Sequence, residues 1–287
     1  MSQSTPTQGE AGRLFREGNL ADAVAAANAA VRKTPTDIGA RILLAEILLF
    51  AGNIERTDVV LDACADLDTT AAIVVAEFRQ LLRGETARRQ LFTDGRVPEF
   101  LGEPTAAQRH ALAAVVALRN GDHAEAGKLA AQSEAARIHP IGTIGDVTFD
   151  DMRDGDDVLG ACIEVITTTG KYFWIPPERV ISLEFHPMKR PRDLFWRRAT
   201  MQVSEGPDGD VYLPTIYPPF ANATTPLTDA LRLGRATDWE QQGAEGPMRG
   251  LGAVTILVGE EAMTWREMAA INFQPAPSPA TPSQLGS

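Results

Sequence analysis

The stretch KYFWIPPERVISLEFHPMKRPRDLFWRRAT, residues 171–200, sets the character of the second half of the chain. It is rich in aromatic residues, much of it alternates between apolar and polar side chains, and it ends in a dense basic run. Alternation with a period of two places successive side chains on opposite faces of a β-strand. The stretch therefore predicts the central strands of a β-rich domain.

Similar strand-like runs lie on both sides of this stretch. Gly, Pro and Asp residues separate them, and TTGKY (168–172) and EGPDGD (205–210) have the composition of hairpin turns. We expect a small β-rich α+β domain over residues 139–273, with short helices at 191–195 and 224–232. The expected strands are ACIEVITT (161–168), KYFWIP (171–176), VISLEFH (180–186), ATMQVSE (199–205), DVYLPTIY (210–217) and AVTILVG (253–259).

The first half of the chain carries an internal repeat. LFREGNLADAV (14–24) is similar to LLFAGNIERTDVV (48–60), so that Gly18 and Gly52 are 34 residues apart. A further copy surrounds Gly121, and a weaker one surrounds Gly84. This period, with a glycine where one helix ends and the next begins, is typical of tetratricopeptide repeats.

The repeat and the helical spacing of apolar residues predict helical hairpins, or parts of them, in four segments: 10–33, 36–64, 70–93 and 105–138. The expected fold is therefore an α+β multidomain chain. A tetratricopeptide-like helical domain occupies residues 1–138, the β-rich domain follows over 139–273, and a Pro/Ser-rich tail over 274–287 is expected to be disordered.

The overall composition is that of an acidic globular protein. Of the 287 residues, 44% are hydrophobic and 23% are charged, with a formal net charge of −11. We find no apolar stretch of the kind that signal peptides or membrane-spanning helices require. Cys64 and Cys162 fit no metal-ligand spacing and are expected to be reduced thiols. These features predict a cytoplasmic protein without membrane attachment.

An acidic segment lies at the start of the second half. Residues 146–157 hold six aspartates and one arginine: Asp146, Asp150, Asp151, Asp154, Asp156, Asp157 and Arg153. Hard metal ions bind clustered carboxylates, so a metal-dependent hydrolase is the alternative function. Because the spacing lacks the EF-hand pattern, we favour a solvated or arginine-paired acidic loop.

The basic run at residues 189–198 carries five Lys and Arg residues and one Asp. Basic side chains next to Phe195 and Trp196 are compatible with binding of single-stranded nucleic acid. We favour pairing within the protein, because an acidic and a basic segment of one domain can neutralise each other through arginine–carboxylate pairs. The expected members of these pairs are Asp150, Asp151, Asp154, Arg192, Arg197 and Arg198.

Motifs of known enzyme classes are missing from the sequence. It contains no Gly-x-Ser-x-Gly, no Walker A loop and no dinucleotide-binding fingerprint. None of the four histidines lies at a known catalytic spacing from a Cys, Ser or carboxylate. We therefore expect neither catalysis nor a cofactor. The acidic total charge and the expected internal pairing of the basic run also predict no binding to nucleic acid.

Several blocks of the second half resemble one protein family. FDDMRDGDDVLG (149–160), GKYFWIP (170–176) and PRDLFWRRA (191–199) carry the resemblance, and LFREGNLADAV (14–24) and FRQLLRGETARRQLFTDGRVPEFL (78–101) extend it into the helical half. On these blocks the chain resembles the ImpE/TagJ family, also called SciE-type. Its members are accessory proteins of bacterial type VI secretion.

The resemblance implies a cytoplasmic adaptor without enzymatic activity. Members of the family are associated with the contractile sheath, where they bind the small sheath subunit TssB near an N-terminal helix. This brings them close to ClpV, the ATPase that disassembles the contracted sheath. Stacked helix pairs offer a groove for such an amphipathic helix. The candidate partner-binding residues in the helical half are Phe50, Phe78, Leu82, Phe92 and Phe100.

Overall fold

The structure, a computed structural model, describes residues 9–65, 67, 71–204, 206–220 and 223–274. The tail expected to be disordered, 274–287, lies outside the described residues except for Gln274.

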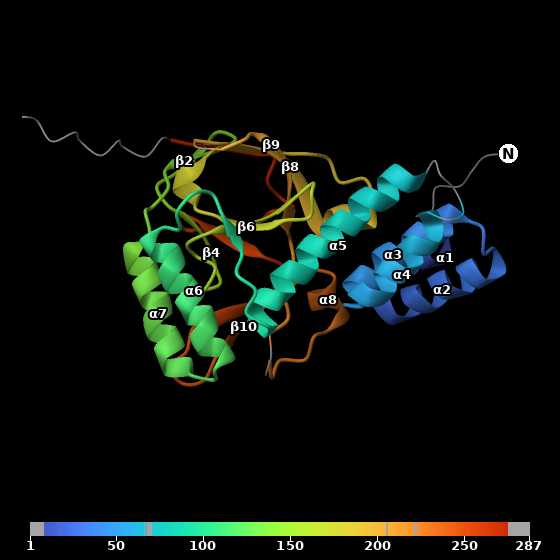
Figure 1. Ribbon diagram of the computed structural model, residues 1–287, viewed down its shortest axis with the longest axis horizontal. Coiled ribbons are helices and arrows are strands. Elements are labelled where there is room, and N and C mark those ends of the chain that lie inside the picture. Colours follow the sequence, from blue (N-terminus) through green and yellow to red (C-terminus); the bar gives the residue numbers. More distant parts are fainter. Residues whose placement is uncertain (1–8, 66, 68–70, 205, 221–222, 275–287) are drawn as a thin grey trace, which may run out of the picture.

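Helices make up the first half of the described chain (Figure 1). The first two hairpins lie beside each other, α5 crosses the molecule, and α6 and α7 form a further hairpin. The helices are α1 (Glu10–Glu17), α2 (Leu20–Lys33), α3 (Ile38–Phe50), α4 (Ile54–Ala65), α5 (Ala72–Thr93), α6 (Ala106–Arg119) and α7 (His123–Ala136).

The repeat glycines explain where the hairpins turn. Gly18, Gly52 and Gly121 lie between the two helices of their hairpins with φ of 93°, 78° and 77°, a region that L side chains rarely adopt. The expected copy around Gly84 is wrong, because Gly84 lies inside α5. A Cβ atom there would lie 2.4 Å from the Ile166 side chain, so this glycine allows α5 to pack closely on the strand below.

The second half is organised around a nine-stranded sheet. Its strand order is β1-β6-β5-β9-β8-β7-β14-β2-β3, and every neighbouring pair is antiparallel except β1 with β6. The strands are β1 (Glu99–Phe100), β2 (Gly142–Ile144), β3 (Val147–Phe149), β5 (Ile163–Thr167), β6 (Tyr172–Ile175), β7 (Val180–Phe185), β8 (Trp196–Val203), β9 (Gly209–Pro214) and β14 (Ala270–Phe273).

Two smaller sheets complete the β-rich half. One contains β4 (Met152–Asp154), β12 (Thr255–Val258) and β13 (Glu261–Thr264), and the other contains β10 (Thr237–Gln241) and β11 (Met248–Gly252). The two expected short helices are present as a 3₁₀ turn, η4 (Pro191–Leu194), and α8 (Asp229–Arg232); a further 3₁₀ turn, η3 (Pro177–Arg179), precedes β7. The mixed α+β fold class predicted from the sequence is confirmed.

The helical and β-rich halves share one hydrophobic core. Phe50 of α3 packs edge-on against Phe195, and Phe78 of α5 packs edge-on against Trp196 of β8. Although β1 comes from the helical half of the chain, it extends the large sheet by pairing with β6. The position of the first two hairpins relative to the sheet is therefore fixed by buried contacts.

Candidate functional site

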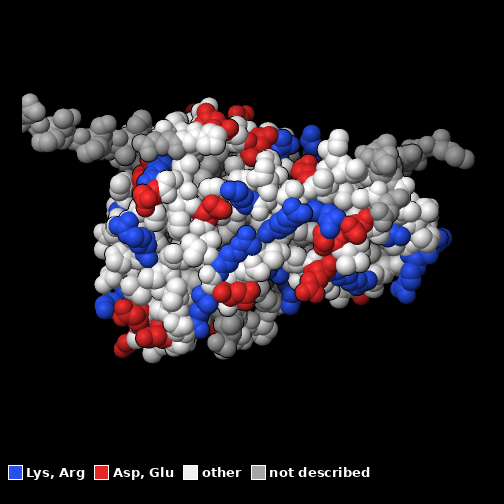
Figure 2. All heavy atoms as spheres, viewed as in Figure 1, with Lys and Arg blue, Asp and Glu red and all other residues white. Residues whose placement is uncertain are grey.

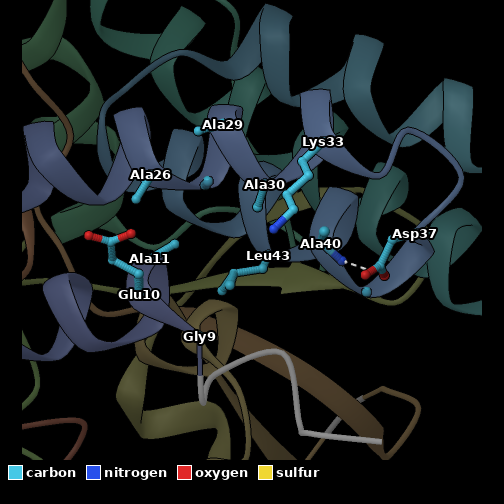
Figure 3. Close-up of a pocket in the computed structure, with 12 residues that line it drawn as sticks. Gly9, Glu10, Ala11, Ala26, Ala29, Ala30, Lys33, Asp37, Ala40 and Leu43 are labelled. Carbon is cyan, nitrogen blue, oxygen red and sulfur yellow. Dashed lines mark hydrogen bonds between the residues drawn. The ribbon is translucent and has the colours of Figure 1, made fainter.

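A groove of about 410 Å³ lies between α1, α2 and α3 in the first two hairpins (Figure 3). Most of the side chains around it are small. Its lining residues are Gly9, Glu10, Ala11, Ala26, Ala27, Ala29, Ala30, Lys33, Asp37, Gly39, Ala40 and Leu43.

The groove exists because α2 presents alanines where a packed helix normally carries larger residues. Ala26, Ala30 and Lys33 follow the three- and four-residue spacing that places side chains on one helix face. Alanine is the best helix former, so α2 remains stable while its surface stays shallow. Leu43 of α3 is buried beside these alanines. The result is an apolar floor that the backbone of another helix can approach closely.

Charged residues lie at the rim of the groove. Figure 3 shows Glu10 and Lys33 on opposite sides of the groove, with Ala30 and Leu43 between them. Both charged residues are exposed, and neither forms an ion pair with any residue that the structure describes. Asp37 accepts a hydrogen bond of 3.0 Å from the Ala40 amide and so caps α3. An apolar floor between charges of both signs suits one face of an amphipathic helix.

The partner-binding residues chosen from the sequence lie elsewhere. Phe50, Phe78, Leu82 and Phe92 are 3%, 0%, 3% and 6% exposed and belong to the shared core. Phe100 on β1 is half-buried and packs edge-on against Trp174. None of the five lines the groove, although Phe92 and Phe50 line two other, smaller pockets.

The sequence contains a signal for the groove that a search for large apolar residues overlooks. The run AAANAA at residues 25–30 supplies four of the groove-lining alanines. Small residues in a repeat helix mark a place where the helix surface is shallow, because they fill less of the space between hairpins.

The acidic segment finds its partners outside the basic run, so the predicted pairing between these two segments is wrong. Asp151 binds both terminal nitrogens of Arg137, at 2.6 and 2.7 Å. Asp154 accepts a hydrogen bond of 2.6 Å from the Tyr217 hydroxyl. Asp150 is exposed and forms no ion pair within the described part of the chain.

The basic run is likewise paired with other acids. Arg192 donates to Glu77 of α5 at 2.9 Å, and Arg198 donates to Asp210 of β9 at 2.5 Å. The physical reason is topology. The acidic segment contributes β4 to the three-stranded sheet and β3 to one edge of the nine-stranded sheet, whereas the basic run leads into β8, which β7, β14 and β2 separate from β3. Arg197 has no carboxylate partner among the described residues.

Four of the six aspartates of the acidic segment, Asp151, Asp154, Asp156 and Asp157, are engaged in protein contacts. Asp156 is fully buried and accepts hydrogen bonds of 2.9 and 2.7 Å from Nε of Arg249. Burial, reinforced by the charge of Asp156, raises the pKa of Asp154 well above its usual value, which favours a protonated carboxyl. Across the described ranges, no three His, Cys, Asp or Glu side chains are grouped as a metal site.

Charges of both signs are interspersed over the face seen in Figure 2, with Lys and Arg side chains following the line of α5. This face therefore does not carry the broad basic patch typical of proteins that bind nucleic-acid backbones. None of the helices in the described ranges has both the length and the apolar composition needed to cross a membrane.

Comparison with known proteins agrees with this architecture. The sequence profile of the family described as ImpE protein matches residues 146–272. The chain is 32% identical over 230 residues to the type VI secretion system accessory component TagJ of Pseudomonas aeruginosa, covering 80% of each protein. The crystal structure of protein VPA1032 from Vibrio parahaemolyticus superimposes with a TM-score of 0.85 at 26% identity, covering 93% of this chain and 98% of that one.

The relative from Pseudomonas extends the match beyond the ImpE profile into the helical half, because 230 aligned residues exceed the 146–272 range. The crystal structure from Vibrio shares the whole architecture of helical hairpins followed by a sheet-rich half. On this sequence identity and shared fold, the chain belongs to the ImpE/TagJ family, as its sequence blocks predicted.

Proposed function

We propose that the chain is a non-enzymatic adaptor of a bacterial type VI secretion system. Its relative in Pseudomonas aeruginosa is named an accessory component of that system. The partner is the small sheath subunit TssB, and the adaptor acts in the cytoplasm. By holding TssB it assists or tunes sheath assembly and the disassembly that ClpV drives, with ClpV contacted indirectly.

The groove between α1, α2 and α3 is the observation that carries this proposal. Helix-binding grooves combine an apolar floor with flanking polar groups, and repeat proteins bind their ligands in the grooves between stacked helix pairs. An alanine floor favours a helix that carries its larger apolar residues towards the groove, since the groove itself supplies none apart from Leu43. Glu10 and Lys33 then set the orientation of the bound helix through its charged residues.

The test is a titration of the full chain with a fluorescently labelled peptide that covers the N-terminal helix of TssB from the same bacterium. Fluorescence anisotropy reports binding, and unlabelled peptide must compete. Saturable binding in the micromolar range supports the adaptor. If neither the peptide nor intact folded TssB binds, TssB is not the partner.

A matched pair of variants locates the bound helix. Ala30 lines the groove and is exposed, whereas Ala25 is exposed on the same helix and lies outside the groove. Ala30→Arg is expected to weaken peptide binding at least ten-fold because it fills the groove with a long charged side chain. Ala25→Arg adds the same residue without blocking the groove and is expected to bind normally. Equal affinities for the two variants contradict docking in this groove.

A further inference from the structure

A second pocket, of about 240 Å³, lies where the basic run meets α5 and β9, and it shares no residue with the groove. Five of its lining residues are Lys or Arg and two are Asp or Glu, an excess of three positive charges. The cations are Lys189, Arg190, Arg192, Arg197 and Arg198, and the acids are Glu77 and Asp193.

Arg197 is the most unusual of these cations. Its side chain is 6% exposed, and its guanidinium forms no hydrogen bond or ion pair with any described residue. Its guanidinium lies over the face of Phe185, 5.7 Å from the ring centre. Burial lowers the pKa of Arg197, and the charge of Asp193 offsets this only in part. A buried charge without a partner is costly, and native proteins normally neutralise it.

Two neighbouring arginines also have unused donors. Arg192 is 7% exposed and donates one hydrogen bond, from Nη2, to Glu77. Its Nε and Nη1 have no partner in the described structure. Arg190 has an unpartnered Nη1, and its nearest carboxylate, on Glu46, is 4.0 Å away. Guanidinium donors from three arginines therefore remain unmatched around one pocket.

The two acids of the pocket are already committed to other groups. Asp193 accepts hydrogen bonds from the backbone amides of Lys189 and Arg190, at 2.8 and 3.1 Å, and so holds the 3₁₀ turn. Glu77 is shared between Arg192 and the hydroxyl of Tyr212. Neither acid is within ion-pair distance of Arg197. Arg198 is paired with Asp210, which lies outside the lining of the pocket. The buried donors of Arg197, and those of Arg192 and Arg190 named above, have no anionic partner in the described structure.

We propose that this pocket binds a phosphate group. A tetrahedral phosphate presents oxygens in several directions and can accept from several guanidinium groups at once, whereas a planar carboxylate matches a single arginine fork. The volume of about 240 Å³ is below the roughly 300–1,000 Å³ typical of pockets for drug-sized ligands, so the ligand is free phosphate or the phosphate end of a small ester.

The test is isothermal titration calorimetry of the full chain with inorganic phosphate, adenosine monophosphate and acetate at matched ionic strength. Phosphate is expected to bind at one site. Tighter binding of adenosine monophosphate than of phosphate identifies an ester as the ligand, and equal or weaker binding identifies the free ion. If phosphate and the ester both fail to bind, or if acetate binds as tightly as phosphate, the proposal is wrong.

Variants separate binding from a structural role of the arginine. Arg197→Met is expected to weaken phosphate binding at least ten-fold. Because it removes a buried unpaired charge, it is also expected to raise the melting temperature of the ligand-free protein. Arg190→Gln, at a half-exposed position, is a second variant that is expected to weaken phosphate while the fold is kept. Arg109→Met, on the exposed surface of α6, is the control and leaves binding unchanged. Unchanged phosphate affinity in both pocket variants contradicts the proposal.

Discussion

Arg88 of α5 donates two hydrogen bonds, of 2.8 and 2.6 Å, to the carboxylate of Glu164 on β5. Its third guanidinium nitrogen donates to the Ile216 carbonyl at 3.0 Å. Arg88 is 0% exposed and Glu164 is 6% exposed. The pair joins the helix that crosses the molecule to an inner strand of the nine-stranded sheet. Burial by itself lowers the pKa of Arg88, but the charges of Glu164 and Glu85 raise it above its usual value.

Removing one member of this pair is expected to be strongly destabilising. In Arg88→Met the Glu164 carboxylate loses its partner while still buried, which costs about 3–5 kcal/mol of unfolding free energy. Urea denaturation measures this loss. Arg13→Met is the control, because its ion pair with Glu17 is exposed and is worth less than about 1 kcal/mol. Similar losses in the two variants would show that the buried pair does not hold α5 on the sheet.

The close approach of α5 to the sheet gives a second prediction. In Gly84→Ala the new Cβ lies 2.4 Å from Ile166, so the helix or the strand must shift, which costs about 1–3 kcal/mol. Helix propensity alone predicts the opposite sign, because alanine is favoured over glycine inside a helix by about 1 kcal/mol. Gly209→Ala, where no atom lies within 4 Å of the new Cβ, is the control. Urea denaturation shows whether the free energy of unfolding falls, as the close contact predicts, or rises, as helix propensity alone predicts.

Sequence patterns predicted the elements whose signals are local. The glycines at 18, 52 and 121 mark hairpin turns because a positive φ is required there. Alternation marks β7 and β8, in which buried and more exposed residues largely alternate, whereas β5 is buried on both faces. Strands of two or three residues, such as β1 and β4, are too short to show any alternation. Their pairing depends on the arrangement of distant segments.

The candidate sites were harder to predict because they depend on space and distance. Ion pairs join residues far apart in the chain, as Arg192 and Glu77 do across 115 positions, so counting charges in neighbouring segments could not identify the partners. The groove is made by what alanines leave unfilled, a property that hydrophobic periodicity does not measure. Large apolar residues such as Phe50 indicate a hydrophobic core before they indicate a binding surface, and Phe50 is buried in the core.

The burial of Phe50 leads to a prediction that separates stability from binding. Its ring packs edge-on between Phe15 and Phe195, with ring centres 5.0 and 5.3 Å away. Phe50→Ala is expected to lower the unfolding free energy by about 3–5 kcal/mol through the cavity it leaves. The folded fraction of this variant is expected to bind the TssB peptide with the same affinity as the unaltered chain. A ten-fold loss of affinity here, together with normal binding by Ala30→Arg, would move the partner surface from the groove to these aromatic residues.

The last prediction concerns pH and rests on Glu46 of α3. This carboxyl is 3% exposed, and its Oε1 has no hydrogen-bond partner among the described residues. Burial raises its pKa from 4.5 to about 7, and the charges of Arg190 and Arg192 oppose this shift only in part. Because the folded state holds its proton more tightly than the unfolded chain, Glu46 causes no loss of stability below about pH 4.5. Stability then falls as the pH rises from about 4.5 to about 7 and levels off above that.

Glu46→Gln removes this titration while keeping the shape of the side chain. The variant and the unaltered protein are expected to differ little near pH 4.5, and the variant is expected to be the more stable one above pH 7, by up to about 3 kcal/mol at 1.36 kcal/mol per pKa unit. Urea denaturation across this range measures the difference. A stability difference that stays constant with pH would mean that Arg190, 4.0 Å from the carboxylate, neutralises Glu46 fully in the folded protein.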